Sequence, residues 1–411
     1  MAELPGGRRL AYWRNQRGMS QQAFADALGK SKSWVDKVER GTRRLDTLSN
    51  LQEIARTLQV DVDVLIDTDT DTETAAAGPT TVPVGPVGGR DLDTLRAALF
   101  AYDATLAPPD GAEPAPAEPR RGVGHAWLAL QHADYRTLLG TLPRLLRDGH
   151  RRRAAHPDDP QPCHLLAQGY QLTSTVLRKL GDPGLAWLAA DRAMTVCRDA
   201  DDDALTLAAT GHLTRVLHTL GRHRHTVEVA LTVAHRLTPP DPLTAPPTHL
   251  TGYGNLLLQA ARGAAGRGDP VGVADLLDHA DEVATLVGDD RHDHGLSFGP
   301  TLVALTRVIT ALDLDQHTTA VTRHRSALDS TTFHQLPPEP RAAHLLDVTH
   351  GCVRLNDLTE AGRALLLADQ ATPTEVRSRP AARETIRTLL RRCGKPHPGI
   401  VRLAEALRIA V

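Results

Sequence analysis

The sequence predicts an all-α protein with a small N-terminal domain, a linker and a large helical-repeat domain. Apolar residues recur at helical spacing through most of the chain, as they do at Leu92, Leu95 and Leu99. Strand signals are weak, because aromatic residues make up only 3% of the 411 residues and alternation of apolar and polar residues is not sustained. Turn residues, three of them glycines, recur at long intervals between the helical segments.

Residues 18–44 have the pattern of two short helices joined by a tight turn. Ser20 and Ser31 are suitable N-caps, because a hydroxyl can accept from a free backbone N–H group of the first turn. Gly29 and Gly41 are placed to end the two helices. Such a pair is a helix-turn-helix, and further helices are expected on both sides of it. The expected core residues are Leu10, Trp13, Phe24, Leu28, Val35, Val38, Leu51, Ile54, Ala55 and Leu58.

Positive charge is concentrated in this domain, although the whole chain has a formal net charge of −2. Residues 5–44 hold ten basic and three acidic side chains, whereas residues 61–73 hold six acids and no base. A solvated charged face is the alternative explanation. Because the excess coincides with the capped helix pair, a surface that faces phosphates is the better interpretation.

The segment SQQAFADALGKSKSWVDKVERG resembles the XRE-type helix-turn-helix of relatives of the phage lambda repressor, and the resemblance covers about residues 6–66. It implies that the second helix lies in the major groove of double-stranded DNA. The residues that it places on base edges are Lys32, Ser33 and Lys37. Those that it places on phosphates are Gln21, Lys30, Arg40 and Arg43. Trp34 either packs against the preceding helix or contacts a sugar or a thymine methyl group.

A single domain of this kind binds DNA weakly, because its few phosphate contacts give non-specific dissociation constants of only about 10⁻⁴ to 10⁻⁶ M. The resemblance therefore also implies a homodimer on paired half-sites.

The composition changes sharply after this domain. Residues 67–89 read DTDTDTETAAAGPTTVPVGPVGG, which cannot bury enough apolar surface to offset the entropy cost of ordering. The expected division is a helix-turn-helix domain at 1–67, a flexible linker at 68–90 and a helical domain at 91–411. A second proline-rich stretch, at 107–119, follows the first helix of the large domain.

Internal repetition dominates the large domain. In the clearest copy, YQLTSTVLRKLGDPGLAWLAADRAM, Gly181 marks a turn between two helices, and Ala186, Ala190 and Ala193 follow it. The other expected turns lie at Ala133 with Asp134, Gly221, Gly268, Asp315 and Asn356. Small residues allow the two helices of a unit to pack closely, and each unit can bury its apolar face only against its neighbours. The pattern resembles the tetratricopeptide repeat, with spacings of 40 to 48 residues in place of about 34.

The whole arrangement resembles actinobacterial regulators that join an XRE domain to a tetratricopeptide-like domain. AWLAADRAM (186–194) and SFGPTLVAL (297–305) carry that resemblance. It implies a sequence-specific transcriptional regulator, most simply a ligand-responsive repressor. The alternative is an adaptor whose repeat groove binds a partner protein while the N-terminal domain tethers it to DNA.

A repeat array presents a concave groove lined by the first helix of each unit. The residues expected there are Gln168, Gln171, Arg178, Arg215, His218, Asn255 and Arg262. Three arginines on one surface are suited to a carboxylate, a peptide terminus or a phosphate. The alternative is that they are ordinary solvated side chains in an arginine-rich chain.

The remaining motifs favour neither catalysis nor a metal or cofactor site. The 20 histidines include HRH (223–225) and RHDHG (291–295), but none has the HExxH spacing. GRGD (266–269) lacks the Lys-Ser/Thr of a phosphate-binding loop. Four cysteines without a close pair fit a reducing cytoplasm, and no apolar stretch reaches the roughly 18 residues of a membrane span. We expect no enzyme activity, no cofactor, no metal and no membrane contact.

Overall fold

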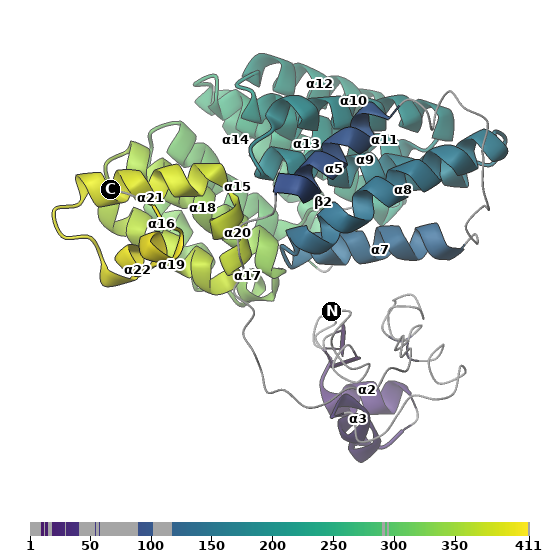
Figure 1. Ribbon diagram of the computed structural model, residues 1–411, viewed down its shortest axis with the longest axis horizontal. Helices are drawn as coiled ribbons and strands as arrows, with labels where there is room; N and C mark the ends of the chain where they lie inside the picture. Colours follow the sequence, from purple (N-terminus) through teal and green to yellow (C-terminus); the bar gives the residue numbers. More distant parts are fainter. Residues whose placement is uncertain are drawn as a thin grey trace. The chain divides into compact units, whose positions relative to one another are not determined.

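The computed structural model describes residues 10–11, 13–14, 19–28, 30–40, 54, 57, 89–101, 117–289, 292–293 and 296–409. The chain divides into two compact units, residues 1–83 and residues 84–411. Apart from one short pair of strands, every regular element in these ranges is a helix, so the predicted all-α class is confirmed (Figure 1). Within the same ranges, no helix has both the length and the apolar character needed to cross a membrane.

The N-terminal unit contains the predicted pair of short helices, α2 (Gln21–Ala27) and α3 (Lys32–Glu39). The hydroxyl of Ser31 caps α3, since it accepts from the Trp34 N–H at 3.1 Å. The buried core of the described residues consists of Leu10, Phe24, Ala25, Leu28, Val35, Val38 and Ile54, with Trp13, Met19 and Trp34 packed against it. The two turn glycines and three of the expected core residues, Leu51, Ala55 and Leu58, lie outside the described residues.

The large unit is a succession of helices with one short ribbon. The helices are α5 (Gly89–Phe100), α7 (Ala117–Gln131), α8 (Tyr135–Ala155), α9 (Gln161–Lys179), α10 (Pro183–Ala200), α11 (Asp203–Thr219), α12 (His223–Arg236), α13 (Pro247–Ala265), α14 (Pro270–Val287), α15 (Pro300–Asp313), α16 (His317–Leu328), α17 (Thr331–Gln335), α18 (Pro338–Arg354), α19 (Leu358–Ala371), α20 (Pro373–Ser378), α21 (Pro380–Arg392) and α22 (Pro398–Ala406). Strands β1 (His292–Asp293) and β2 (Leu296–Ser297) are antiparallel, and His292 pairs with Ser297.

The turns within the helix pairs repeat one geometry. All six predicted turn residues have a positive φ, between 55° and 89°: Ala133, Gly181, Gly221, Gly268, Asp315 and Asn356. The next N–H donates to the carbonyl five residues earlier, as from Asp182 to Leu177 at 2.9 Å and from Asp357 to Cys352 at 2.8 Å. These bonds satisfy the last carbonyls of the first helix. In four of the turns the following aspartate also caps the second helix, and Asp182 does so by accepting from the Leu185 N–H.

Small residues lie where the helices of a pair approach each other most closely. Ala186, Ala190 and Ala193 are fully buried on α10, which packs against α9. Gly181 is required for a second reason besides its φ of +89°. A Cβ atom there would lie 2.9 Å from Cγ of Pro380, at the start of α21.

The two ends of the large unit meet. Helix α7 contacts α18, and hydrogen bonds join Tyr135 to Glu375 and Lys179 to Glu339. The paired residues are 240 and 160 positions apart in the chain. The concave surface predicted from the repeats is therefore the wall of a partly enclosed space, rather than an open groove.

Candidate DNA-binding and ligand-binding sites

Most of the residues expected to contact DNA lie on or beside α3. The exposed side chains among them belong to Lys30, Lys32, Ser33, Lys37 and Arg40. Arg40 pairs with Asp36 on the same helix at 3.0 Å. Trp34 packs against the edge of the core, with Nζ of Lys30 5.9 Å from its ring centroid. Arg43 lies outside the described residues.

A buried ion pair fixes the orientation of α3. Nε and Nη2 of Arg14 donate to the carboxylate of Glu39 at 2.6 and 3.2 Å, and Nη1 donates to the Met19 carbonyl at 2.6 Å. The side chains of Arg14 and Glu39 are only 9% and 8% exposed. Nε2 of the half-buried Gln21 donates to the same carboxylate at 2.7 Å, so this residue also supports α3, and its expected phosphate contact stays a prediction.

Sequence reasoning missed the role of Glu39, although one signal was available. Glu39 follows Val35 by four positions, which places its carboxylate on the buried face of α3. A carboxylate there requires a buried cation, because an unpaired buried charge is strongly unfavourable.

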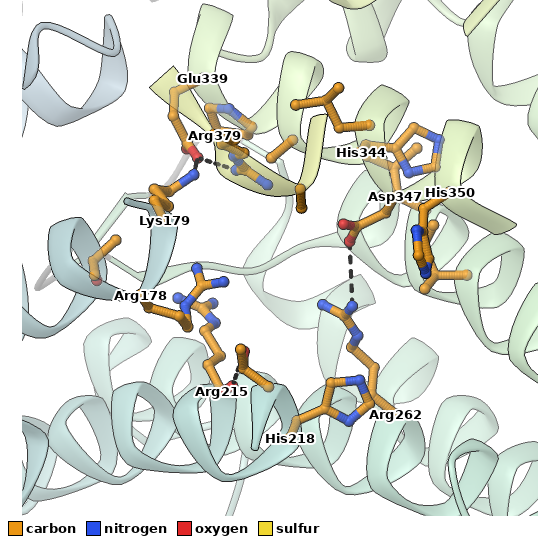
Figure 2. Close-up of a pocket in the computed structure, with 18 of the residues that line it drawn as sticks. Arg178, Lys179, Arg215, His218, Arg262, Glu339, His344, Asp347, His350 and Arg379 are labelled. Carbon is orange, nitrogen blue, oxygen red and sulfur yellow. Dashed lines mark hydrogen bonds and ion pairs between the residues drawn. The ribbon is translucent and has the colours of Figure 1, made fainter. Parts of the chain in front are cut away.

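A cavity of about 780 Å³ lies within the large unit (Figure 2). Its walls come from α7, α9, α10, α11, α13, α15, α18 and α21, with one residue from β2 and the connecting residues Gly181 and Arg379. Of the residues expected in the groove, those that line the cavity are Arg178, Arg215, His218, Asn255 and Arg262. Gln168 and Gln171 are not among its lining residues, which corrects their expected placement. Gln168 accepts from Nε1 of Trp127 at 3.0 Å. Gln171 is fully buried, and its side-chain amide has no hydrogen-bond partner among the described residues.

The three predicted arginines have different surroundings. Arg262 forms an ion pair with Asp347 at 3.2 Å. Arg178 and Arg215 form no ion pair with any carboxylate in the described ranges, and both are half-buried. Burial, together with the charge of Arg178, lowers the pKa of Arg215 to about 10. Burial also lowers the pKa of Arg178, and the nearby Arg379 adds to this effect. The cavity thus holds two guanidinium groups without an ion-pair partner in the described ranges, and the carboxylate of Glu339 acts on both only from a longer distance.

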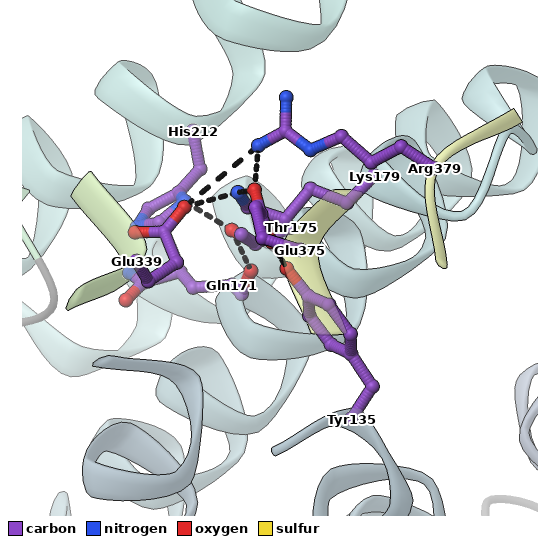
Figure 3. Close-up of polar contacts among 8 residues, drawn as sticks. All are labelled: Tyr135, Gln171, Thr175, Lys179, His212, Glu339, Glu375 and Arg379. Atoms are coloured by element: carbon purple, nitrogen blue, oxygen red, sulfur yellow. Dashed lines mark hydrogen bonds and ion pairs between the residues drawn. The ribbon is translucent and has the colours of Figure 1, made fainter. Parts of the chain in front are cut away.

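A cluster of buried charges closes one side of the cavity (Figure 3). Nζ of Lys179 donates to Glu375 at 2.7 Å and also to Glu339, and Arg379 donates to Glu375. The Tyr135 hydroxyl donates to the other carboxylate oxygen of Glu375. Burial alone would raise the pKa of Glu375, but Arg379 and Lys179 outweigh it and lower that pKa to about 2.

Sequence reasoning did not identify this cluster. Its members come from α8, α9, α18, α20 and the residue just before α21. Repeat units are recognised by residues that recur at a fixed spacing and pack against the next unit. Contacts between the two ends of the array involve residues outside this spacing, so the repeat pattern does not reveal them.

Two histidines, His324 on α16 and His344 on α18, are buried against each other, and neither pairs with a carboxylate in the described residues. Nδ1 of His324 lies 3.3 Å from Nε2 of His344. Burial lowers the pKa of His344 to about 3, and the neighbouring His324 contributes to the shift. In the described part of the chain, no group of three or more His, Cys, Asp or Glu side chains is arranged to hold a metal ion. The pair is therefore best described as neutral imidazoles within the core.

The buried His344 should make the large unit sensitive to acid. Because its pKa is lower in the folded state than its ordinary value of 6.5, the unfolded chain binds the proton more tightly. The contribution of His344 to stability is complete above pH 6.5 and decreases as the pH falls from 6.5 towards 3. At pH 5 the expected loss is about 2 kcal/mol for this residue.

Urea unfolding at pH 7.5 and pH 5 checks this expectation. The variant His344→Gln should lose less stability between the two pH values than the native chain, while the exposed control His225→Gln should behave like the native chain. Glu375 does not interfere, because its pKa of about 2 confines its effect to pH values below its ordinary 4.5. Equal pH dependence in all three proteins would contradict the assignment.

Comparison with known proteins identifies the N-terminal unit. Residues 7–67 match the family of helix-turn-helix domains. No curated protein is significantly similar to the chain in sequence. Among solved structures, the chain is similar to that of Bacillus thuringiensis PlcR in complex with the peptide PapR7 and DNA. The sequence identity is 12%, the similarity covers 69% of this chain and 95% of that chain, and the TM-score is 0.26. The helix-turn-helix match supports a DNA-binding regulator.

Proposed function

We propose that the protein is a sequence-specific transcriptional regulator of the XRE type, whose helical-repeat unit binds a small effector. The observation that carries the DNA-binding part is the helix-turn-helix match over residues 7–67, with Lys32 and Lys37 exposed on its second helix. A homodimer on paired half-sites follows from the weak binding of a single domain.

The partly enclosed cavity favours a small effector over a partner protein. A pocket of about 780 Å³ lies within the range of about 300–1,000 Å³ that is usual for small ligands. A partner protein would instead need a broad exposed apolar surface. In the described residues, the exposed large apolar side chains are divided among three helices, α5, α10 and α14, and two connecting segments. They are Phe100, Trp187, Leu220, Leu243, Val271 and Leu286. This distribution over five segments does not favour a partner protein.

Regulation requires that the effector bind the DNA-competent and DNA-incompetent states with different affinities, since tight binding alone shifts no equilibrium. A repeat array is suited to this coupling, because small rotations between units add up along the array. Half-sites about 34–36 Å apart tolerate little change in the spacing of two DNA-binding domains. Repression is the simplest outcome of such coupling.

The base-reading assignment can be tested on α3. Lys32→Ala and Lys37→Ala should each lower the affinity for the specific site by about 1–3 kcal/mol, because a base contact is lost. Affinity for random DNA should fall much less. Arg43→Ala should weaken binding to every sequence and reduce the salt dependence of binding. Fluorescence anisotropy with the specific site and a scrambled duplex measures both effects.

Lys395→Ala is the matched control, because Lys395 is exposed in the large unit, far along the chain from α3. It should leave both affinities unchanged. If Lys32→Ala and Lys37→Ala weaken binding to both duplexes equally, these lysines contact phosphates, and the base-reading assignment is wrong.

A further inference from the structure

One end of the cavity is lined by cations, and some of these cations have no carboxylate partner. Five cations line it, and three of them have carboxylate partners: Arg262 with Asp347, and Lys179 and Arg379 within the buried cluster. Arg178 on α9 and Arg215 on α11 have none in the described ranges. Figure 2 shows both side chains extending into the same part of the cavity, and the charge of Arg178 lowers the pKa of Arg215. Two half-buried like charges beside each other repel, and an anion between them would relieve this repulsion.

The same cavity has an apolar wall. Leu302, Leu305, Ile309 and Leu312 of α15 all line it, at the spacing of one helix face. Leu258 of α13 and Leu346 of α18 extend this wall. Leu302 is half-buried and the other side chains of this wall are 2–7% exposed, so the apolar surface that remains faces the cavity and would be covered by an apolar ligand.

The remaining charges limit the number of anionic groups on the ligand. Asp313, Glu339 and Asp347 also line the cavity. These carboxylates would repel a ligand that carried negative charge along its whole length. A single anionic group at the arginines and a neutral remainder satisfy both constraints.

From these observations we infer that the cavity binds a small amphipathic anion, with one carboxylate or phosphate group between Arg178 and Arg215 and an apolar chain against α15. This inference rests on the proposed function of the cavity as the effector site and gives the chemical class of the effector. A guanidinium pair is suited to either head group, because each fork can donate two parallel hydrogen bonds to a planar or tetrahedral oxyanion.

Isothermal titration calorimetry on the full chain tests the inference with defined probes. Decanoate and decyl phosphate represent the two head groups, decanol lacks the charge, and acetate and inorganic phosphate lack the chain. We expect one decanoate or decyl phosphate per cavity, bound at least about tenfold more tightly than decanol, because charge-assisted hydrogen bonds are lost with the neutral probe. Affinity should rise about fourfold for each methylene between hexanoate and decanoate.

The double variant Arg178→Gln with Arg215→Gln should lose at least about tenfold in affinity for the anionic probe and keep its affinity for decanol. Its melting temperature without ligand should be unchanged or higher, since two uncompensated charges are removed. Arg236→Gln is the matched control, because Arg236 is exposed on α12, and it should bind like the native chain. If the double variant does not unfold cooperatively, Arg215→Gln alone provides the same comparison.

Several outcomes would overturn the inference: decanol binding as tightly as decanoate, the short anions binding as tightly as the long ones, or unchanged affinity in the arginine variants. DNA binding, measured in the same samples, separates this failure from failure of the proposed function. A chain that binds specific DNA but no anionic probe remains a DNA-binding protein with a different ligand. If the chain binds the probe through its arginines but binds no specific DNA, the inference about the ligand stands and the proposed regulatory function is wrong.

Discussion

Replacement of Glu375 by alanine is expected to lower the free energy of unfolding of the large unit by about 3–5 kcal/mol. Glu375 is fully buried and accepts hydrogen bonds from Lys179, Arg379 and Tyr135. Its removal leaves two buried cations with one carboxylate, Glu339, between them. Because the cluster joins α8 and α9 to α20, the loss should also separate the two ends of the array.

Urea unfolding followed by circular dichroism measures this effect, because most described helices belong to the large unit. Glu405→Ala is the control, since Glu405 is exposed on α22 and should change stability by less than about 0.5 kcal/mol. Glu375→Gln keeps the side-chain volume and should be intermediate. Equal midpoints for Glu375→Ala and Glu405→Ala would show that the cluster does not hold the array closed.

Replacement of Glu39 by alanine should destabilise the helix-turn-helix unit by a similar amount, about 3–5 kcal/mol. The change leaves Arg14 buried without its partner and frees the amide of Gln21. The orientation of α3 depends on these contacts, so binding to the specific site should fall sharply even though every exposed basic residue remains.

Hydrogen exchange of the full chain, measured by mass spectrometry on peptides that cover residues 19–40, localises this effect to the small unit. Asp36→Ala is the matched control on the same helix, because Asp36 pairs with an arginine that is 73% exposed. Its effect should be at most about 1 kcal/mol. Exchange rates in Glu39→Ala no faster than those in Asp36→Ala would contradict the role of the buried pair.

The parts of the structure that depend on local backbone geometry were predictable from the sequence. A turn between two packed helices needs a residue that tolerates positive φ, and Gly181, Gly221 and Asn356 are recognisable because few residue types do so. Counting back from such turns by helical periodicity also placed Arg178, Arg215 and Arg262 on one inner surface. The N-cap at Ser31 followed from the same kind of local rule.

The parts that depend on contacts between distant segments were not predictable. Asp347 and Glu375 come from late helices, yet they pair with Arg262 and Lys179, which lie far earlier in the chain. Gln171 shares a helix face with Thr175 and Arg178, yet it is fully buried. The burial of the Gln171 side chain depends on which other helices pack over that turn of α9, and the apolar pattern of α9 alone does not show this.

Selection of bound duplexes from a random DNA library by the purified protein tests whether this chain reads a DNA sequence. We expect enrichment of one motif made of two related half-sites, centred about one helical turn or a multiple of it apart. The double variant Lys32→Ala with Lys37→Ala should weaken the base preference within each half-site, while Lys395→Ala should select the native motif. Recovery of no sequence above the starting library by the native protein would contradict the claim that this protein is a sequence-specific regulator.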